Sequence, residues 1–177
     1  MSNEEHKQQA SKTLRCVIIT PTDSRDAASD ASGDLMAELL QGAGHVVVGR
    51  HLLPNDATAL DKLLREQGAD DAVDVLLCTG GTGLGPRDVT ADVVQALLTK
   101  HLPGFGELFR HLSYAEIGTS TILSRATGGA FGQKLLFSLP GSKKAVRLAV
   151  EKILLPELVH MLRELRGKRA ASPSNLV

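Results

Sequence analysis

The sequence predicts a single α/β domain, a three-layer helix–sheet–helix sandwich around a mostly parallel sheet. Short apolar runs alternate along the chain with segments in which apolar residues recur at helical spacing. Strands that alternate with helices form parallel βαβ units, and helices then cover both faces of the sheet. A chain of 177 residues with one Tyr, four Phe and no Trp must build its core from aliphatic side chains, which suits this architecture.

In the first half of the chain, the apolar pattern predicts three strands separated by helices. The continuous apolar run Leu14–Thr20 is typical of a buried strand, and the largely apolar segments Val46–Leu53 and Val73–Thr79 predict the second and third strands. Between them, leucines at helical spacing predict one helix around Leu35–Leu40 and a second from about Asp56 to Gly68. A polar side chain, that of Asp30, is expected to cap the first of these helices.

In the second half, two helices precede a hairpin and two follow it. Turn residues at Gly128, Gly129 and Gly132 interrupt extended pieces, which predicts a hairpin that ends in a last buried strand. The expected elements are a helix around Val93–Leu98, a chain break at Pro103–Gly106, a short helix at Glu107–His111, a strand at Lys134–Leu139, a helix opened by Pro140–Ser142 and another from Pro156. The domain is predicted to span residues 14–166, with disordered tails at 1–13 and 167–177 because both are polar and without period.

Composition excludes several classes of function. Lys plus Arg and Asp plus Glu both number 20, so the chain lacks the broad basic charge of a nonspecific nucleic-acid binder. No apolar run reaches the length of a membrane span, and the first residues do not resemble a signal sequence. Cys16 and Cys78 lie in apolar runs without metal-binding spacing, which indicates reduced, buried thiols. We therefore expect a cytoplasmic protein without nucleic-acid or membrane partners.

The most informative segment is the glycine-rich loop that follows the third predicted strand. Gly80, Gly81, Gly83 and Gly85 fall within six residues, so backbone N–H groups can converge there on an anion or a flat polar ring. A loop at the carboxyl end of a parallel strand also lies where open α/β folds bind ligands. A tight connection without a ligand is the alternative. The loop matches neither the dinucleotide-binding nor the P-loop pattern.

Charged residues beside this loop have a structural and a functional interpretation. Asp88 can cap the next helix, or it can bind Mg²⁺ next to bound phosphates. Arg87 can clamp a phosphate or remain a solvated surface charge. Asp23, just past the first strand, is either a turn residue or a ligand contact. Ser142 can cap a helix and still face a ligand in the loop Pro140–Ser142.

Five segments, in this order, resemble the MoaB/MogA family of molybdenum-cofactor proteins and the similar amino-terminal domain of gephyrin. They are Thr79–Gly83, Pro86–Thr90, Pro103–Glu107, Leu123–Arg125 and Leu139–Ser142. The resemblance covers about residues 14–165 and is closer to the MoaB type. It implies a fold that binds molybdopterin, adenylylation of molybdopterin with ATP and Mg²⁺ in the catalytic members, and assembly as a homo-trimer or hexamer.

The resemblance also implies residue roles. The loop residues Gly80, Gly81, Thr82 and Gly83 would line the ligand site, and Asp88 would be a catalytic, metal-associated carboxylate. The pterin or its phosphate would contact the side chain of Ser124 and the loop of Pro140, Gly141 and Ser142.

One departure from the family pattern concerns catalysis. Catalytic members carry an aspartate after the second strand, where this chain has Asn55 followed by Asp56. Asn and Asp are comparable helix caps, so the fold should tolerate the change, whereas a Mg²⁺ site would lose a negative charge. Asp56 can replace the missing acid only if the turn shifts. Two alternatives therefore remain, an active adenylyltransferase and a pterin-binding protein with little or no turnover.

Overall fold

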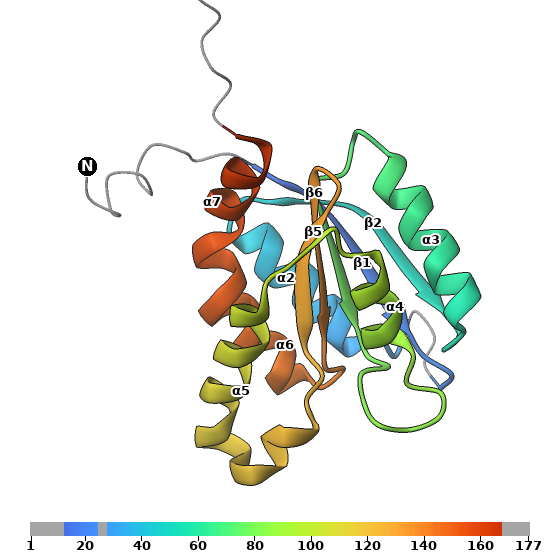
Figure 1. The fold of residues 1–177 in the computed structure, drawn as a ribbon, viewed down its shortest axis with the longest axis vertical. Coiled ribbons are helices and arrows are strands. Elements are labelled where there is room, and N and C mark those ends of the chain that lie inside the picture. Colours follow the sequence, from blue (N-terminus) through green and yellow to red (C-terminus); the bar gives the residue numbers. More distant parts are fainter. Residues whose placement is uncertain (1–12, 25–27, 168–177) are drawn as a thin grey trace, which may run out of the picture.

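A computed structural model describes residues 13–24 and 28–167 and confirms the α/β architecture. Within these residues, six strands form one sheet in the order β2-β1-β3-β6-β5-β4 (Figure 1). Neighbouring strands pair in parallel from β2 to β6, whereas β5 runs antiparallel to β6 and β4 antiparallel to β5. The sheet is therefore mostly parallel, as predicted. The strands are β1 (Arg15–Pro21), β2 (Val46–Leu53), β3 (Val75–Thr79), β4 (Lys100–His101), β5 (Thr127–Phe131) and β6 (Lys134–Leu139).

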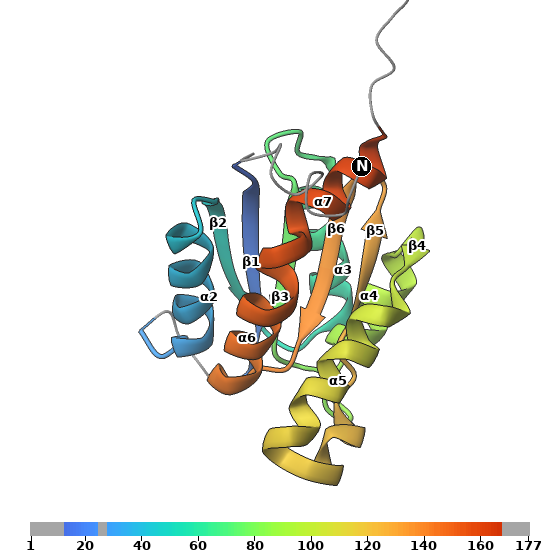
Figure 2. The same cartoon turned by 90° about the vertical axis from the view of Figure 1, so that its left-hand side faces the viewer.

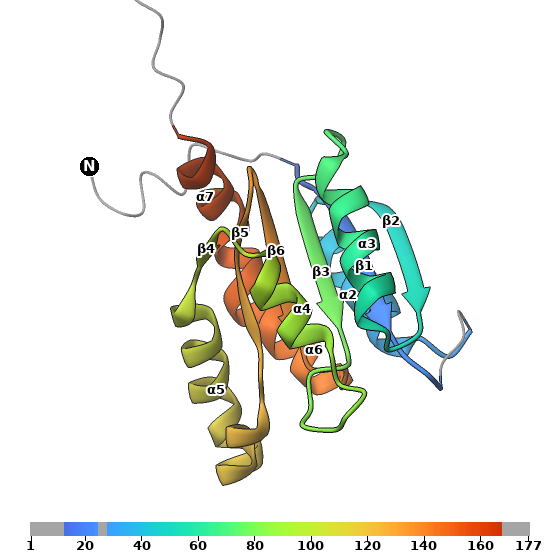
Figure 3. The same cartoon turned by 45° about the vertical axis from the view of Figure 1, so that its right-hand side comes forward.

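Helices cover both faces of the sheet, because alternate residues of its buried strands point to opposite sides. Ile18 of β1 faces the core beneath α2, α5, α6 and α7 (Figure 2), whereas Val17 and Ile19 face α3 and α4 (Figure 3). Two irregular helices, η1 and η2, extend this pattern. The helices are α2 (Ala31–Gly42), α3 (Ala57–Ala69), α4 (Thr90–Leu97), α5 (Pro103–Ile117), η1 (Gly118–Leu123), α6 (Lys143–Ala149), η2 (Val150–Leu154) and α7 (Leu155–Arg166).

Two helices differ from the sequence prediction, and proline explains both differences. Pro103 begins α5 instead of breaking the chain, so this helix has 15 residues and the short helix at Glu107–His111 is wrong. Proline suits the first turn of a helix, where its missing N–H group needs no partner. Pro156 likewise does not open a separate helix, because α6, η2 and α7 follow one another without a break from Lys143 to Arg166.

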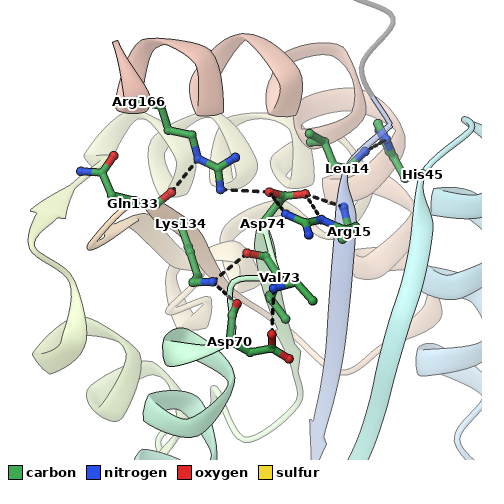
Figure 4. A network of polar contacts seen from close by, with 10 residues as sticks. Leu14, Arg15, His45, Asp70, Val73, Asp74, Gln133, Lys134 and Arg166 are labelled. Carbon is green, nitrogen blue, oxygen red and sulfur yellow. Dashed lines mark hydrogen bonds and ion pairs between the residues drawn. The ribbon is translucent and has the colours of Figure 1, made fainter. Parts of the chain in front are cut away.

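The end of the sheet at which β1, β3 and β6 begin is closed by a polar network (Figure 4). Asp74, immediately before β3, accepts hydrogen bonds from the backbone and side chain of Arg15 at 2.9–3.0 Å. It also pairs with Arg166 from the end of α7 at 2.9 Å. Lys134 of β6 donates to the carbonyl oxygens of Asp70 and Val73. These contacts attach α7 and three strands to one another.

Several smaller expectations can be compared with the structure. Asp30 caps α2 by accepting a hydrogen bond from Gly33 N at 3.1 Å, as predicted. Cys16 and Cys78 are buried free thiols, and burial raises the pKa of each to about 12. The predicted tails lie outside the described residues except for Thr13 and Gly167. Among the residues described, no helix combines the length and the apolar character that crossing a membrane requires.

Candidate functional site

The carboxyl ends of β2, β1, β3 and β6 carry the loops that contain most of the candidate residues (Figure 1). A pocket of about 460 Å³ opens between these loops, and we call it the polar pocket. The order of the strands explains this convergence, since parallel neighbours end at the same edge of the sheet. The pocket is lined by Pro21, Thr22, Asp23, Ser24, Asn55, Gly80, Gly81, Thr82, Gly83, Asp88 and Gly141.

The glycine-rich loop folds tightly against its neighbours. Gly81 has φ +62°, a conformation that glycine adopts without steric cost, and its carbonyl accepts a hydrogen bond from Thr90 N at 2.9 Å. A Cβ atom on Gly83 would lie 2.6 Å from Asp88 Oδ2. A side chain at position 83 would therefore displace the Asp88 carboxylate from its place against the backbone.

Asp88 does not cap the following helix. The N-cap of α4 is Val89, which makes no side-chain cap hydrogen bond. The Asp88 carboxylate instead accepts a hydrogen bond from Gly85 N at 2.9 Å and lines the polar pocket. Of the two roles that the sequence left open, the structure therefore removes helix capping and keeps ligand or metal contact.

Asp23 connects the loops on two sides of the polar pocket. It pairs with Arg87 through two hydrogen bonds of 2.6 and 2.8 Å and accepts two more from the backbone and amide nitrogens of Asn55, at 3.0 and 3.2 Å. The bonds from Arg87 and then those from Asn55 hold the pKa of Asp23 well below its usual range. Asp23 is therefore a carboxylate at pocket level, and Arg87 is an ion-pair partner rather than a lone surface charge.

The structure separates the roles of Asn55 and Asp56. Asp56 is the N-cap of α3 and accepts a hydrogen bond from Ala59 N at 2.7 Å, whereas Asn55 lines the polar pocket. The expectation that Asn and Asp are interchangeable caps at position 55 is therefore wrong. An aspartate there would face the Asp23 carboxylate without the hydrogen bond that the Asn55 amide donates.

A second pocket, of about 310 Å³, adjoins the first, and we call it the apolar cavity. Thr82 and Gly83 line both, so the glycine-rich loop forms a shared wall between the two spaces. Ser142, which also caps α6 by accepting from Ala145 N at 3.2 Å, contributes to the apolar cavity. The remaining lining residues are Phe109, Ser113, Glu116, Ile117, Ser120, Leu123, Ser124, Pro140, Lys144, Ala145 and Leu148.

Sequence reasoning missed several of these lining residues. Ser113, Glu116 and Ile117 lie on the part of α5 that the short predicted helix left out. Lys144 adds a cation beside Ser142, at the start of α6. The signal for Lys144 was present, because it lies two residues after Ser142, but a lysine at a helix start is usually a solvated charge.

Comparison with known proteins decides the family. Residues 15–160 match the family model described as "Probable molybdopterin binding domain". The chain belongs to this molybdenum-cofactor biosynthesis family, of the MoaB/MogA type. It is 49% identical over 166 residues to molybdenum cofactor biosynthesis protein B of Bacillus cereus, an alignment that covers 93% of this chain and 98% of the relative.

Solved structures of the family share the fold. A crystal structure of a molybdenum cofactor biosynthesis protein B has 48% sequence identity and a TM-score of 0.86, and the match covers 89% of this chain and 99% of that one. The tungsten cofactor synthesizing protein MoaB from Pyrococcus furiosus has 37% identity and a TM-score of 0.80, with 89% and 100% covered. The family resemblance found in the sequence is therefore confirmed over nearly the whole described chain.

Proposed function

We propose that the chain functions in molybdenum-cofactor biosynthesis by binding molybdopterin across the two pockets. The observation that carries the proposal is their shared wall, because Thr82 and Gly83 line both the apolar cavity and the polar pocket. The apolar cavity offers aliphatic walls and several hydroxyl groups, as a flat ring with polar edges requires. The terminal phosphate of the pterin then reaches the glycine-rich loop, where backbone N–H groups converge.

The polar pocket suits the triphosphate of ATP together with Mg²⁺. The available donors are oxygens: the Asp88 carboxylate, the Asp23 carboxylate and Asn55 Oδ1, a buried atom with no hydrogen-bond partner in the described chain. Oxygen donors fit Mg²⁺, which is commonly held by one or two carboxylates and by substrate phosphates. Among the described residues, no group of three or more acidic, His or Cys side chains is placed to hold a metal ion by itself, so the substrate phosphates would have to complete the coordination.

We further propose that the chain adenylylates molybdopterin. A phosphate oxygen of the pterin forms a bond to the α-phosphorus of ATP as the bond to pyrophosphate breaks, so no protein nucleophile is required. Bound Mg²⁺ would supply charge neutralisation for the phosphates. Asp88 would hold the metal, the glycine-rich loop would orient the pterin phosphate, and Arg87 would exchange Asp23 for a phosphate oxygen.

A specific contact favours the second candidate, a pterin-binding protein with little turnover. Asn55 occupies the place of the acid found in catalytic members, and its amide is committed to Asp23 at 3.2 Å. A neutral side chain there leaves the polar pocket with one negative charge fewer for the metal. Both candidates predict pterin binding, and they differ only in turnover.

One assay distinguishes them. Purified protein is incubated with molybdopterin and Mg·ATP, and adenylyl-molybdopterin and pyrophosphate are quantified together. Formation of both products in equal amounts supports the enzyme, whereas pterin binding without product supports the binding protein. Absence of saturable pterin binding would overturn the proposed function in both forms. Ala145→Leu, which fills the apolar cavity, should weaken pterin binding, and Ala72→Leu, at an exposed position before β3, is the matched control.

Self-association is also part of the proposal. Large apolar side chains are exposed along α5 and η1, including Tyr114, Ile117 and Ile122, the last at 80% exposure. Exposed apolar patches of this kind mark contact surfaces. We expect a homo-trimer or hexamer, and sedimentation equilibrium would measure its mass. A monomer at all concentrations would contradict this part.

A further inference from the structure

The segment between η1 and β5 contains an arginine whose whole head group is engaged. Arg125 Nε donates to the carbonyl oxygen of Thr82 at 3.2 Å, and Nη2 donates to that of Asp88 at 2.6 Å. Its Nη1 pairs with both carboxylate oxygens of Asp92 on α4, at 2.8 and 2.9 Å. The side chain is 26% exposed. Three nitrogen atoms thus hold three separate residues.

Two of these partners flank residues 83–87, the second half of the glycine-rich loop. Thr82 precedes residues 83–87, Asp88 follows them, and both line the polar pocket. Within the loop, Asp88 exchanges hydrogen bonds with Gly85 through its backbone N–H and its carboxylate, at 3.0 and 2.9 Å. Those bonds give the loop its internal shape, but they do not fix it relative to the sheet. Arg87 attaches one side of the loop to Asp23, just past β1. Arg125 attaches Thr82 and Asp88, which flank residues 83–87, to the segment that leads into β5.

The fork of a guanidinium is suited to this contact. Its N–H groups diverge in one plane and can reach two carbonyl oxygens and a carboxylate at once, whereas an ammonium group on a flexible stem cannot fix the same angles. Thr82 is buried, so losing the donor leaves its carbonyl without this partner in a place that water reaches poorly. The preceding residue, Ser124, lines the apolar cavity, so this short segment lies beside both pockets.

We propose that Arg125 is a positioning residue, which fixes the glycine-rich loop and thereby places Asp88 in the polar pocket. Arg125 itself does not line that pocket in the structure. The fixing of the loop is independent of what binds there. The consequence for turnover rests on the proposed function, because a carboxylate that is displaced by about 1 Å can cost a reaction about 100-fold.

The first experiment is amide hydrogen exchange without ligand. Arg125→Gln should accelerate exchange of the amides in residues 83–88 by about 10-fold or more, while exchange in β1 and β3 stays at the wild-type rate. Arg65→Gln, the same change in an exposed arginine paired with Asp61 on α3, is the matched control and should leave the loop unchanged. Unchanged exchange at residues 83–88 in Arg125→Gln would overturn the proposal.

The second experiment separates positioning from general damage. Adding guanidinium ion at non-denaturing concentration to Arg125→Ala should slow loop exchange again, and equal NaCl should not. In the turnover assay, kcat of this variant should fall about 10- to 100-fold with KM for ATP nearly constant, and guanidinium should restore it. If the variant loses turnover only because less of it is folded, kcat per folded molecule stays unchanged and guanidinium does not restore activity. That result would contradict the proposal.

The two proposals fail in different ways. If the wild-type protein makes no adenylyl-molybdopterin, the adenylylation proposal fails, while loop exchange and its rescue still decide the role of Arg125. If the wild type turns over and Arg125→Gln does so equally well, the role of Arg125 is wrong and the function stands. If Arg125→Gln does not fold, Arg125→Lys replaces it in the exchange experiment, because lysine keeps the charge but lacks the guanidinium fork. Exchange of residues 83–88 at the wild-type rate in Arg125→Lys would then overturn the proposal.

Discussion

Charged side chains gather at both ends of the central sheet, but the two ends differ in what those side chains contact. Where β1, β3 and β6 begin, Asp74 is 4% exposed and is enclosed by Arg15 and Arg166 (Figure 4). Where the same strands end, Asp23 and Asp88 sit on loops around an open pocket. The first end satisfies its charges internally. At the second end, Asp23 is paired with Arg87 and Asn55, whereas the Asp88 carboxylate lines the pocket and is available to a ligand.

This difference shows which acids stabilise the fold and which are available for chemistry. Burial raises the pKa of Asp74, but hydrogen bonds from Arg15 and Arg166 outweigh that effect and lower it to about 2. Such a carboxylate contributes to the free energy of unfolding. The Asp88 carboxylate accepts one hydrogen bond, from Gly85 of its own loop, and lines the pocket, where it can meet a cation. We call the end with Asp74 the closed end and the end with Asp23 and Asp88 the open end. Substitutions at the open end should therefore affect turnover, and those at the closed end should affect the free energy of unfolding.

The largest expected effect is on turnover, at the open end. Asp88→Asn should lower formation of adenylyl-molybdopterin by about 100-fold or more, because removal of a charge that stabilises the transition state commonly costs that much. Its melting temperature should stay close to that of the wild type. Asp61→Asn, the same change in a carboxylate that faces solvent on α3, should keep full activity. Retained turnover in Asp88→Asn would exclude the catalytic role of Asp88.

At the closed end, the corresponding change should affect stability instead. Asp74→Asn leaves Arg15 and Arg166 without their shared counter-charge and should lower the free energy of unfolding by about 2–3 kcal/mol. Urea denaturation measures this value. Pterin affinity of the folded variant should remain within about twofold, since additive behaviour is expected for distant sites. A large loss of affinity would mean that the two ends are coupled.

Acid should lower the free energy of unfolding through the same residue, Asp74. The pKa of Asp74 is lowered in the folded protein, so its contribution is fully present above about pH 4 and is lost as the pH falls toward 2. A shift of nearly two pKa units corresponds to roughly 2 kcal/mol. The difference in stability between wild type and Asp74→Asn should therefore shrink over this range, as urea titrations at several pH values would show. A constant difference would contradict the assignment.

The smallest effect is expected for Asn55→Asp, which changes the open end toward the family pattern. Without metal, the new carboxylate faces Asp23 and should lower stability by less than about 1 kcal/mol, because both groups are partly exposed. Mg²⁺ should raise the melting temperature of this variant more than that of the wild type, and turnover should rise. If Mg²⁺ has no such effect and turnover stays low, the neutral side chain at position 55 does not limit activity.

Sequence patterns predicted the strands and the loops at their ends better than they predicted the other elements. The runs before Thr79 and Leu139 are continuous and apolar, and their loops converge because the strands are parallel neighbours. Residue patterns also identified the glycine-rich loop and Ser142, which the structure places around adjoining pockets. Convergence of strand ends is a property of topology, so it can be read from the order of elements.

The contacts that could not be predicted join residues far apart in sequence. Arg87 and Asp23 are 64 positions apart, and Arg125 lies 43 positions from Thr82, so no local pattern connects them. The error at Pro103 had a different cause, because proline breaks a helix inside it but favours its first turn. That error shortened α5 and concealed the residues that it contributes to the apolar cavity.

The central claim is that the open end of the sheet is the ligand site and the closed end is not. Amide hydrogen exchange with and without molybdopterin tests it most directly. We predict that the pterin protects residues 80–83 and 141–145, while the amides of Arg15, Asp74 and Lys134 exchange at unchanged rates. Protection confined to the closed end, or no protection at residues 80–83 and 141–145 under saturating pterin, would contradict the account.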